Sequence, residues 1–300
     1  LLINRPRRLS VDIDIIVDPG SNIDEYIRRA GKIFPFANVE EHKRQGVNDV
    51  EKRHFKFHFL SPRNGKEINI LLDVVFGENP YPRVFERPIR NGLLVSAGDD
   101  YTVTLPDKNC ILGDKLTAFA PHTIGIPFGK GKELEIVKQM FDCWTLIQEA
   151  DDYNVVRDAY DRVSNVEIGY RGLDASPADC LKDTIDCCVC VMGRGSVRPN
   201  EYKLLSTGIG ALQGHLFSEK INGENAGAYA SEVAYLAACL LTGQTYERIE
   251  DPEAYRDVAL KIKGIKKISG VRNTNPVAYA HMVKSFQILL EAGIFKDIEL

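Results

Sequence analysis

Apolar and polar positions alternate in a strand-like way at several places in the first half of the chain. Residues 11–17 alternate apolar and mostly acidic side chains, which predicts a β-strand that ends at a Pro-Gly-Ser-Asn turn. Residues 54–60 place phenylalanines between histidines and a lysine, and residues 68–76 form an apolar strand after a Ser-Pro-Arg-Asn-Gly turn. These two segments are predicted to pair as a β-hairpin. Further short strands are expected at 93–96 and 101–105.

Helical spacing replaces this alternation further along the chain. A short helix is expected over residues 24–34, where Pro35 stops it, and nearly every segment from residue 111 onward has apolar residues three and four positions apart. The longer helices are expected at 111–120, 133–150, 153–163, 178–192, 201–217, 226–241, 252–263 and 276–292. The predicted fold class is therefore α+β, with a mixed-sheet lobe over residues 1–150 followed by an all-helical lobe over residues 151–300.

The acidic residues of the first strand are the most informative chemical feature. On a strand, Asp12 and Asp14 point to one face, and Ile13 points to the other. Two neighbouring carboxylates repel unless a cation lies between them, and Mg²⁺ or Mn²⁺ suits such hard oxygen ligands. Asp73 lies in an otherwise apolar strand, where an uncompensated charge is costly, so it is the candidate for a third ligand. Three such carboxylates would form a two-metal site for in-line phosphoryl or nucleotidyl transfer.

These acids also have simpler interpretations. Asp12 and Asp14 are compatible with the solvated face of an edge strand, and Asp73 is compatible with a strand cap. Both alternatives stay open on the residues alone.

Two further charged residues lie on predicted helices among apolar neighbours. Lys115 follows Leu112-Gly113-Asp114, and Asp142 is flanked by Phe141 and Trp144. A lysine on one helix and an aspartate on the next are compatible with a buried ion pair. They are equally compatible with a site in which the lysine holds triphosphate charge and the aspartate orients it or the attacking group.

In chain order, these features resemble the AbiEii/AbiGii-type toxin nucleotidyltransferases of the DNA polymerase β-like superfamily. The resemblance rests on an Arg-x-Ser-x-Asp-x-Asp strand, a later strand acid, a Lys-Leu-x-Ala helix and a basic-x-x-aromatic-Asp-x-x-x-Leu helix. It implies that Asp12 and Asp14 hold metal, that Lys115 contacts nucleotide phosphate and that Asp142 completes the catalytic site. These motifs span residues 8–146, within a nucleotidyltransferase domain expected over residues 1–150.

The remaining motif positions extend this comparison. Arg8 and Ser10 match the positions that precede the metal pair and are expected to help bind the nucleotide. The family's Gly-Gly-Thr or Gly-Ser loop, which helps hold the triphosphate, is expected just upstream of Leu1, so the N-terminal part of the domain is predicted to be missing. The family's Arg-Asp-x-x-Asp reads Lys138-Gln139-x-x-Asp142 here, so its first acid is replaced by an amide.

The resemblance implies a reaction and a biological role. A nucleoside monophosphate would pass from an NTP to an acceptor, with the 3′ end of an RNA such as tRNA as the leading candidate, and an antitoxin protein would neutralise the toxin. Two alternatives remain: transfer to a hydroxyl of a protein or small molecule, and a non-catalytic nucleotide-binding or interaction module.

Composition and charge narrow these possibilities further. The formal net charge of −4 excludes a uniformly basic nucleic-acid coat, but it allows local basic patches such as Arg7 with Arg8, or the run between Lys261 and Arg272. No run of about 18 uncharged apolar residues occurs, so no membrane-spanning segment is expected. The odd number of cysteines, seven, with apolar neighbours, predicts reduced, structural thiols and a cytoplasmic protein.

Overall fold

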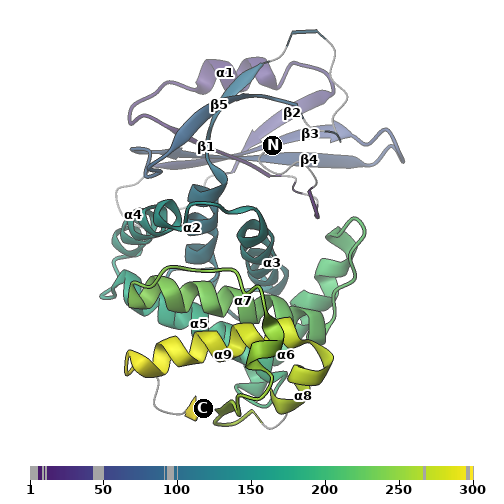
Figure 1. Cartoon of the computed structure of the whole chain (residues 1–300). Helices are drawn as coiled ribbons and strands as arrows, with labels where there is room; N and C mark the ends of the chain where they lie inside the picture. Colours follow the sequence, from purple (N-terminus) through teal and green to yellow (C-terminus); the bar gives the residue numbers. More distant parts are fainter. Residues whose placement is uncertain are drawn as a thin grey trace. The chain divides into compact units, whose positions relative to one another are not determined.

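A four-stranded sheet is built from the first 80 residues, and helices dominate the rest of the chain (Figure 1). The computed structural model describes residues 6–8, 10, 12–42, 51–90, 92, 98–99, 101–265, 268–294 and 298–299. Internal contacts divide the chain into two compact units, here called the sheet unit (residues 9–80 and 170–172) and the helical unit (residues 1–8, 81–169 and 173–300). The α+β fold class is confirmed. The predicted domain division at residue 150 stays a prediction.

The sheet unit is a mixed sheet with one parallel pair. Its strands are β1 (Asp12–Val17), β2 (Phe36–Glu41), β3 (Lys52–Leu60) and β4 (Glu67–Phe76). The strand order is β1-β4-β3-β2, in which β1 runs parallel to β4 and the other neighbours are antiparallel. The predicted first strand and the β3–β4 hairpin are confirmed, whereas β2 was not predicted, since its Phe-Ala-Asn-Val-Glu-Glu sequence lacks regular alternation.

Helix α1 (Asp24–Ala30) covers one face of this sheet. Val74 is fully buried on that face beside Phe55 and Phe57, and Ile23 and Ile27 pack against them. Strand β1 lies at the end of the strand order, and Ile13 is 51% exposed. The sheet core is therefore centred on β3 and β4, and β1 contributes little to it.

The helical unit is built around a buried central helix. Its elements are β5 (Val84–Pro88), β6 (Thr102–Pro106), α2 (Lys108–Ala118), α3 (Glu133–Glu149), α4 (Tyr153–Arg171), α5 (Pro177–Gly193), α6 (Pro199–Leu212), α7 (Gly223–Thr242), β7 (Lys261–Ile262), α8 (Ile268–Thr274), α9 (Pro276–Glu291) and β8 (Ile298–Glu299). The alanine-rich α7 is buried on most sides, and both α5 and α9 pack against it. Small side chains allow this close approach because they leave the helix surface nearly smooth.

Most of the predicted elements of this unit are confirmed, but two helix ends were misplaced: α4 continues past residue 163 to Arg171, and α6 ends at Leu212 and not at residue 217. The strand at 101–105 is β6, which pairs antiparallel with the unpredicted β5. The strand expected at 93–96 lies outside the described residues. Helix α8 was not predicted either.

The helix predicted over residues 252–263 is wrong. Only Pro252–Tyr255 form a short 3-10 turn, and Lys261–Ile262 form a strand paired with Ile298–Glu299. The hydroxyl of Tyr279 on α9 accepts a hydrogen bond from the Leu260 amide at 3.2 Å and donates one to the Val258 carbonyl at 2.6 Å. These tertiary hydrogen bonds occupy backbone groups that a helix would need for itself, so local spacing is overridden.

The cysteines behave as small apolar side chains. All seven are free and buried, including Cys187, Cys188 and Cys190 on α5. Burial raises the pKa of Cys188 and brings the pKa of Cys190 to about 11. The prediction of structural thiols is confirmed. Separately, the described helices include none that combines the length and the apolar character needed to cross a membrane.

A polar cluster connects the segment after α2 to helices α5 and α6. The buried Asp183 accepts hydrogen bonds from the His122 amide (2.8 Å), the His122 ring Nδ1 (2.7 Å) and the Thr123 hydroxyl (2.8 Å). The other ring nitrogen, Nε2, lies 3.1 Å from Glu201. Burial alone would lower the pKa of His122, but the hydrogen bonds and charges of Asp183 and Glu201 together outweigh burial and raise it.

This cluster predicts a pH dependence of stability. Because the folded-state pKa of His122 is raised, its stabilisation is fully present below the unfolded value near 6.5 and is lost as the pH rises through the folded-state pKa. We expect His122→Gln to lower the free energy of unfolding most at about pH 5 and progressively less towards about pH 8. Urea unfolding of both proteins across this range measures the difference, and a difference that does not change with pH would contradict the assignment.

Candidate functional site

The predicted acidic residues share one face of the sheet unit. In the parallel pairing of β1 with β4, Asp14 lies directly beside Asp73, and Asp12 lies two positions earlier beside Leu71. Val74, the next residue on β4, is buried on the α1 face, so Asp73 and its partner Asp14 point to the opposite face. The structure therefore brings the third acid next to the predicted pair.

A histidine from the central hairpin joins this acidic face. His54 on β3 lies beside Asp73 in the antiparallel register, and its ring Nδ1 is 2.7 Å from the Asp73 carboxylate. The sequence pattern placed His54 in an alternating strand and gave it no functional role. The hairpin turn, once recognised, fixes the register and would have placed His54 beside Asp73. His58 lies on the same strand face, with its ring 3.5 Å from Glu40 and 3.3 Å from Glu67, and its side chain is 17% exposed.

The acidic face has the right donor types for a divalent ion, although its side chains are not already gathered around one. Among the described residues, no group of three or more His, Cys, Asp or Glu side chains is arranged to hold a metal ion. Neighbouring strands lie about 4.8 Å apart, so Asp14 and Asp73 occupy adjacent positions on one face of the sheet. Carboxylate oxygens are the ligands that Mg²⁺ and Mn²⁺ prefer. The residues present therefore fit the ion.

A second charged group lies in the helical unit, where Asp142 on α3 meets two cations. Arg8 donates from Nε to one carboxylate oxygen at 2.6 Å and from Nη2 to the other oxygen. The Lys115 ammonium on α2 lies 3.7 Å from the same carboxylate. The Asp142 and Arg8 side chains are only 14% and 15% exposed, so this is a largely desolvated ion pair.

Local structure explains why these side chains meet. Asp107 caps the start of α2 by accepting a hydrogen bond from the Cys110 amide at 2.8 Å, which fixes the register of the helix that carries Lys115. Helices α2 and α3 pack against each other. Arg8 is held through a backbone bridge to Leu216, after α6.

Arg7, the neighbour of Arg8, is also held in place. Its guanidinium lies 2.9 Å from Glu219 and 4.7 Å from the ring centroid of Trp144, which stacks on Tyr229 at 3.8 Å. Arg7 and Arg8 are thus both bound to acidic side chains of the helical unit.

The predicted site residues therefore fall into two groups, one in each unit. The sheet unit holds Asp12, Asp14 and Asp73, with Ser10 exposed just ahead of β1. The helical unit holds Arg8, Lys115 and Asp142.

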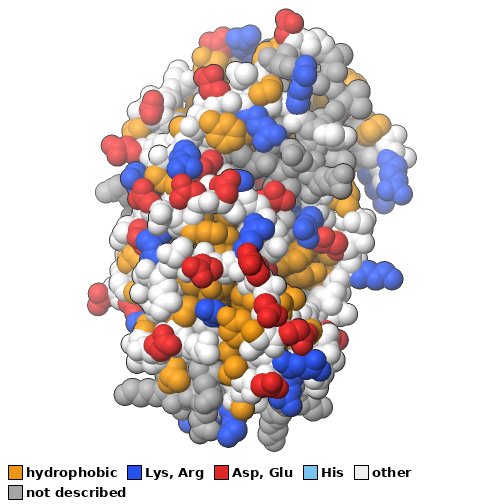
Figure 2. All heavy atoms as spheres, in the orientation of Figure 1, with side chains coloured by type: hydrophobic (Ala, Val, Ile, Leu, Met, Phe, Trp, Pro, Cys, Tyr) orange, Lys and Arg blue, Asp and Glu red, His pale blue; other side chains and the backbone are white. Residues whose placement is uncertain are grey.

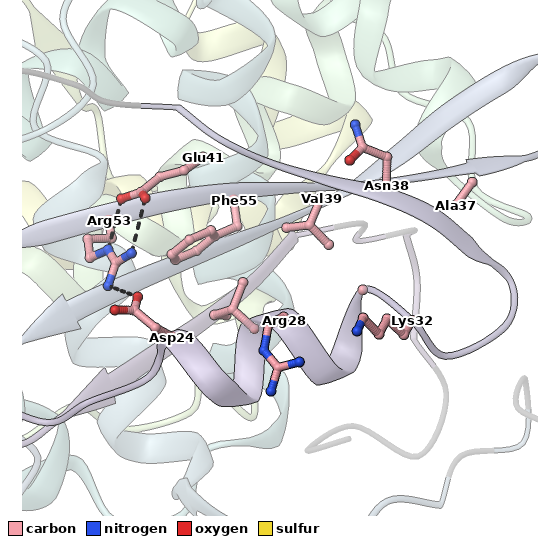
Figure 3. Close-up of a pocket in the computed structure, with 11 residues that line it drawn as sticks. Asp24, Arg28, Lys32, Ala37, Asn38, Val39, Glu41, Arg53 and Phe55 are labelled. Atoms are coloured by element: carbon pink, nitrogen blue, oxygen red, sulfur yellow. Dashed lines mark hydrogen bonds and ion pairs between the residues drawn. The ribbon is translucent and has the colours of Figure 1, made fainter.

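A cavity of about 460 Å³ lies on the opposite side of the sheet from the acidic residues (Figure 3). It lies between α1 and the sheet, and Val39 and Phe55 contribute to its lining. Arg53 spans it by pairing with Asp24 at 2.7 Å and with Glu41 at 2.8 Å. Since none of the predicted site residues lines it, we assign it no role in catalysis.

Positive and negative side chains are intermixed over the described surface drawn in Figure 2. This distribution agrees with the net charge of −4 and with the exclusion of a uniformly basic coat. Any contact with a polyanion would therefore depend on local clusters of a few Lys and Arg side chains.

Comparison with known proteins identifies the family of the chain. A family model described as the nucleotidyl transferase AbiEii toxin of a Type IV toxin–antitoxin system matches residues 1–185, which include both charged groups. No curated protein and no solved structure matched the chain. The match covers more than half of the 300 residues and confirms the resemblance drawn from the motifs. The chain belongs to the AbiEii family of nucleotidyl transferase toxins.

Proposed function

We propose that this protein is a metal-dependent nucleotidyltransferase that moves a nucleoside monophosphate from an NTP to the 3′ end of an RNA, with tRNA as the leading candidate acceptor. The observation that carries the proposal is the register of β1 with β4, which sets Asp14 beside Asp73 with Asp12 on the same face. In a chain of a nucleotidyl transferase family, three carboxylates on one face of a sheet are suitable ligands for a divalent-ion site.

Asp12, Asp14 and Asp73 are the residues that would hold the ion. Mg²⁺ or Mn²⁺ bound there would polarise the α-phosphate of the NTP and neutralise charge on the departing pyrophosphate. His54 accompanies Asp73 on the neighbouring strand and restrains the orientation of that carboxylate through its ring nitrogen.

Lys115 and Asp142 are proposed to serve the same reaction from the helical unit. The Lys115 ammonium would neutralise phosphate oxygens of the nucleotide, and Asp142 would orient the cations around it. The family model spans both residues as well as Asp12, Asp14 and Asp73.

The biological role follows from the family. A toxin of a toxin–antitoxin system has an antitoxin as its counterpart. We propose that transfer to RNA is the toxic activity, since disabling an RNA such as tRNA would halt growth.

The reaction is tested by offering each of four α-labelled NTPs with Mg²⁺ or Mn²⁺ and total tRNA. The control is the Asp12→Ala/Asp14→Ala double variant. Label that moves to RNA with the wild type alone supports the proposal and identifies the donor. Label on protein or on a small molecule retains the metal site and changes the acceptor, and label on neither acceptor contradicts nucleotidyl transfer.

Lys115 has a separate expected effect on substrate affinity. We expect Lys115→Met to raise the KM for NTP by about tenfold or more, since a charge-assisted hydrogen bond contributes about 1.5–3 kcal/mol. Lys182 on α5 pairs with Asp179 at 3.0 Å and is remote in sequence from the motifs, so Lys182→Met is the matched control. An unchanged KM for Lys115→Met in steady-state kinetics would remove Lys115 from the nucleotide site.

A further inference from the structure

Arg8 and Asp142 form a two-point ion pair whose geometry is more specific than a simple charge contact. Arg8 donates from Nε at 2.6 Å to one oxygen and from Nη2 to the other, so both carboxylate oxygens face the guanidinium. Such bidentate pairs fix orientation as well as charge. The carboxylate is therefore held in one direction.

This pairing has a consequence for Lys115. Its ammonium is 3.7 Å from the nearer Asp142 oxygen, which is beyond the 2.7–3.2 Å range of an N–H···O hydrogen bond. The lysine thus lies close enough to feel the carboxylate charge without being bound to it directly.

The backbone around Arg8 is anchored as well. Arg8 forms a bridge with Leu216, and the Phe217 amide donates to the Arg7 carbonyl at 3.1 Å. Arg7 is itself paired with Glu219. Arg8 is therefore a fixed partner for Asp142, unlike a mobile surface arginine, which would pay a larger entropy cost to hold one geometry.

We propose that Arg8 is a positioning residue that occupies both oxygens of Asp142 and thereby keeps Lys115 available to the phosphates of the nucleotide. The inference rests on the proposed function and assigns Arg8 a different role from the direct nucleotide contact that the family resemblance implies. Without Arg8, the largely buried Asp142 would have Lys115 as its nearby cation. A movement of about 1 Å would then convert the 3.7 Å contact into a hydrogen-bonded ion pair and withdraw the ammonium from the substrate.

The test is a double-mutant cycle read by binding, because Asp142 is itself a candidate catalytic residue. The probe is an NTP analogue with a non-hydrolysable α,β-methylene bridge, titrated in the presence of Mg²⁺ by calorimetry. We expect Arg8→Ala to weaken its affinity about tenfold. Adding Asp142→Asn to Arg8→Ala should restore the affinity to that of Asp142→Asn alone, since no carboxylate remains to capture Lys115.

A direct contact between Arg8 and the nucleotide would give a different set of affinities. If Arg8 touches the nucleotide, Arg8→Ala and Arg8→Ala/Asp142→Asn will bind equally weakly, and the proposal is overturned. Arg8→Lys keeps the charge but loses the two-point geometry, so it should also weaken binding and also be restored by Asp142→Asn. This variant serves if Arg8→Ala fails to fold, which thermal unfolding will report.

A matched control is available on α4. Arg162 forms the same kind of pair with Asp158, at 2.7 Å from Nε and 3.0 Å from Nη2, but on the surface. Arg162→Ala should leave the affinity unchanged. If Lys115→Met also leaves the affinity unchanged, the proposed role of Lys115 fails. If Lys115→Met weakens binding but Asp142→Asn does not restore it in the Arg8 variants, only the role of Arg8 fails.

Discussion

Replacing Asp14 by asparagine is expected to lower nucleotidyl transfer by at least about a thousandfold, equivalent to about 4 kcal/mol of lost transition-state stabilisation. Asparagine keeps the shape of the side chain but removes the charge that a divalent ion needs. Asp14 is exposed on β1 and lies beside Asp73, so losing one of two adjacent like charges should not destabilise the sheet. Initial rates of label transfer and thermal unfolding of the same preparation measure the two effects.

Asp18 supplies the matched control for this substitution. It is an exposed carboxylate just past the end of β1, outside the paired register that unites Asp14 and Asp73. Asp18→Asn should therefore keep the wild-type rate. Turnover of Asp14→Asn within about tenfold of the wild type would show that the acidic strand does not carry the chemistry.

Substituting alanine for Gly208 is expected to have the largest effect on stability, a loss of about 3 kcal/mol. Gly208 lies on α6 where it crosses α3, and an added Cβ would clash with the Glu133 carbonyl oxygen and lie 2.8 Å from Val137 Cγ2. A backbone carbonyl inside a helix cannot move aside cheaply, so the two helices would have to separate. Urea unfolding should show a lower midpoint with an unchanged slope.

For Gly210, two residues further along α6, substitution by alanine is expected to change the stability in the opposite direction. A Cβ there would meet nothing within 4 Å. Gly210→Ala should stabilise the protein by about 0.5–1 kcal/mol, because alanine loses less conformational entropy in a helix. Equal effects of the two substitutions would rule out close packing of α6 on α3 as the reason for Gly208.

The parts of the site that were predictable are those set by local pattern. Alternation placed Asp12 and Asp14 on one strand face, and the turn chemistry after residue 60 gave the β3–β4 hairpin. Asp73 was proposed because an acid in an apolar strand is costly, but only the parallel pairing of β1 with β4 sets it beside Asp14. Which strands pair depends on the packing of the whole sheet, so the pairing cannot be predicted from any one segment.

The parts that sequence reasoning missed depend on contacts between distant residues. Arg8 and Asp142 are 134 positions apart, and no periodicity links them. The failed helix at 252–263 shows the same limit, because Tyr279 binds backbone groups of that segment from another helix. His54 lay within reach of prediction, since the hairpin register determines its neighbour on β4.

The central claim is that the acidic face of the sheet unit is the divalent-ion site of the proposed nucleotidyltransferase, and Mn²⁺ binding tests it most directly. The protein is titrated with Mn²⁺ in the presence of a non-hydrolysable NTP analogue, and electron paramagnetic resonance measures the concentration of free Mn²⁺ at each step. A titration of the analogue without protein gives the Mn²⁺ that the analogue itself binds. The account predicts that the wild type and Asp18→Asn bind Mn²⁺ alike, while Asp14→Asn and Asp73→Asn each bind it at least about tenfold more weakly. Equal Mn²⁺ binding by all four proteins would contradict it.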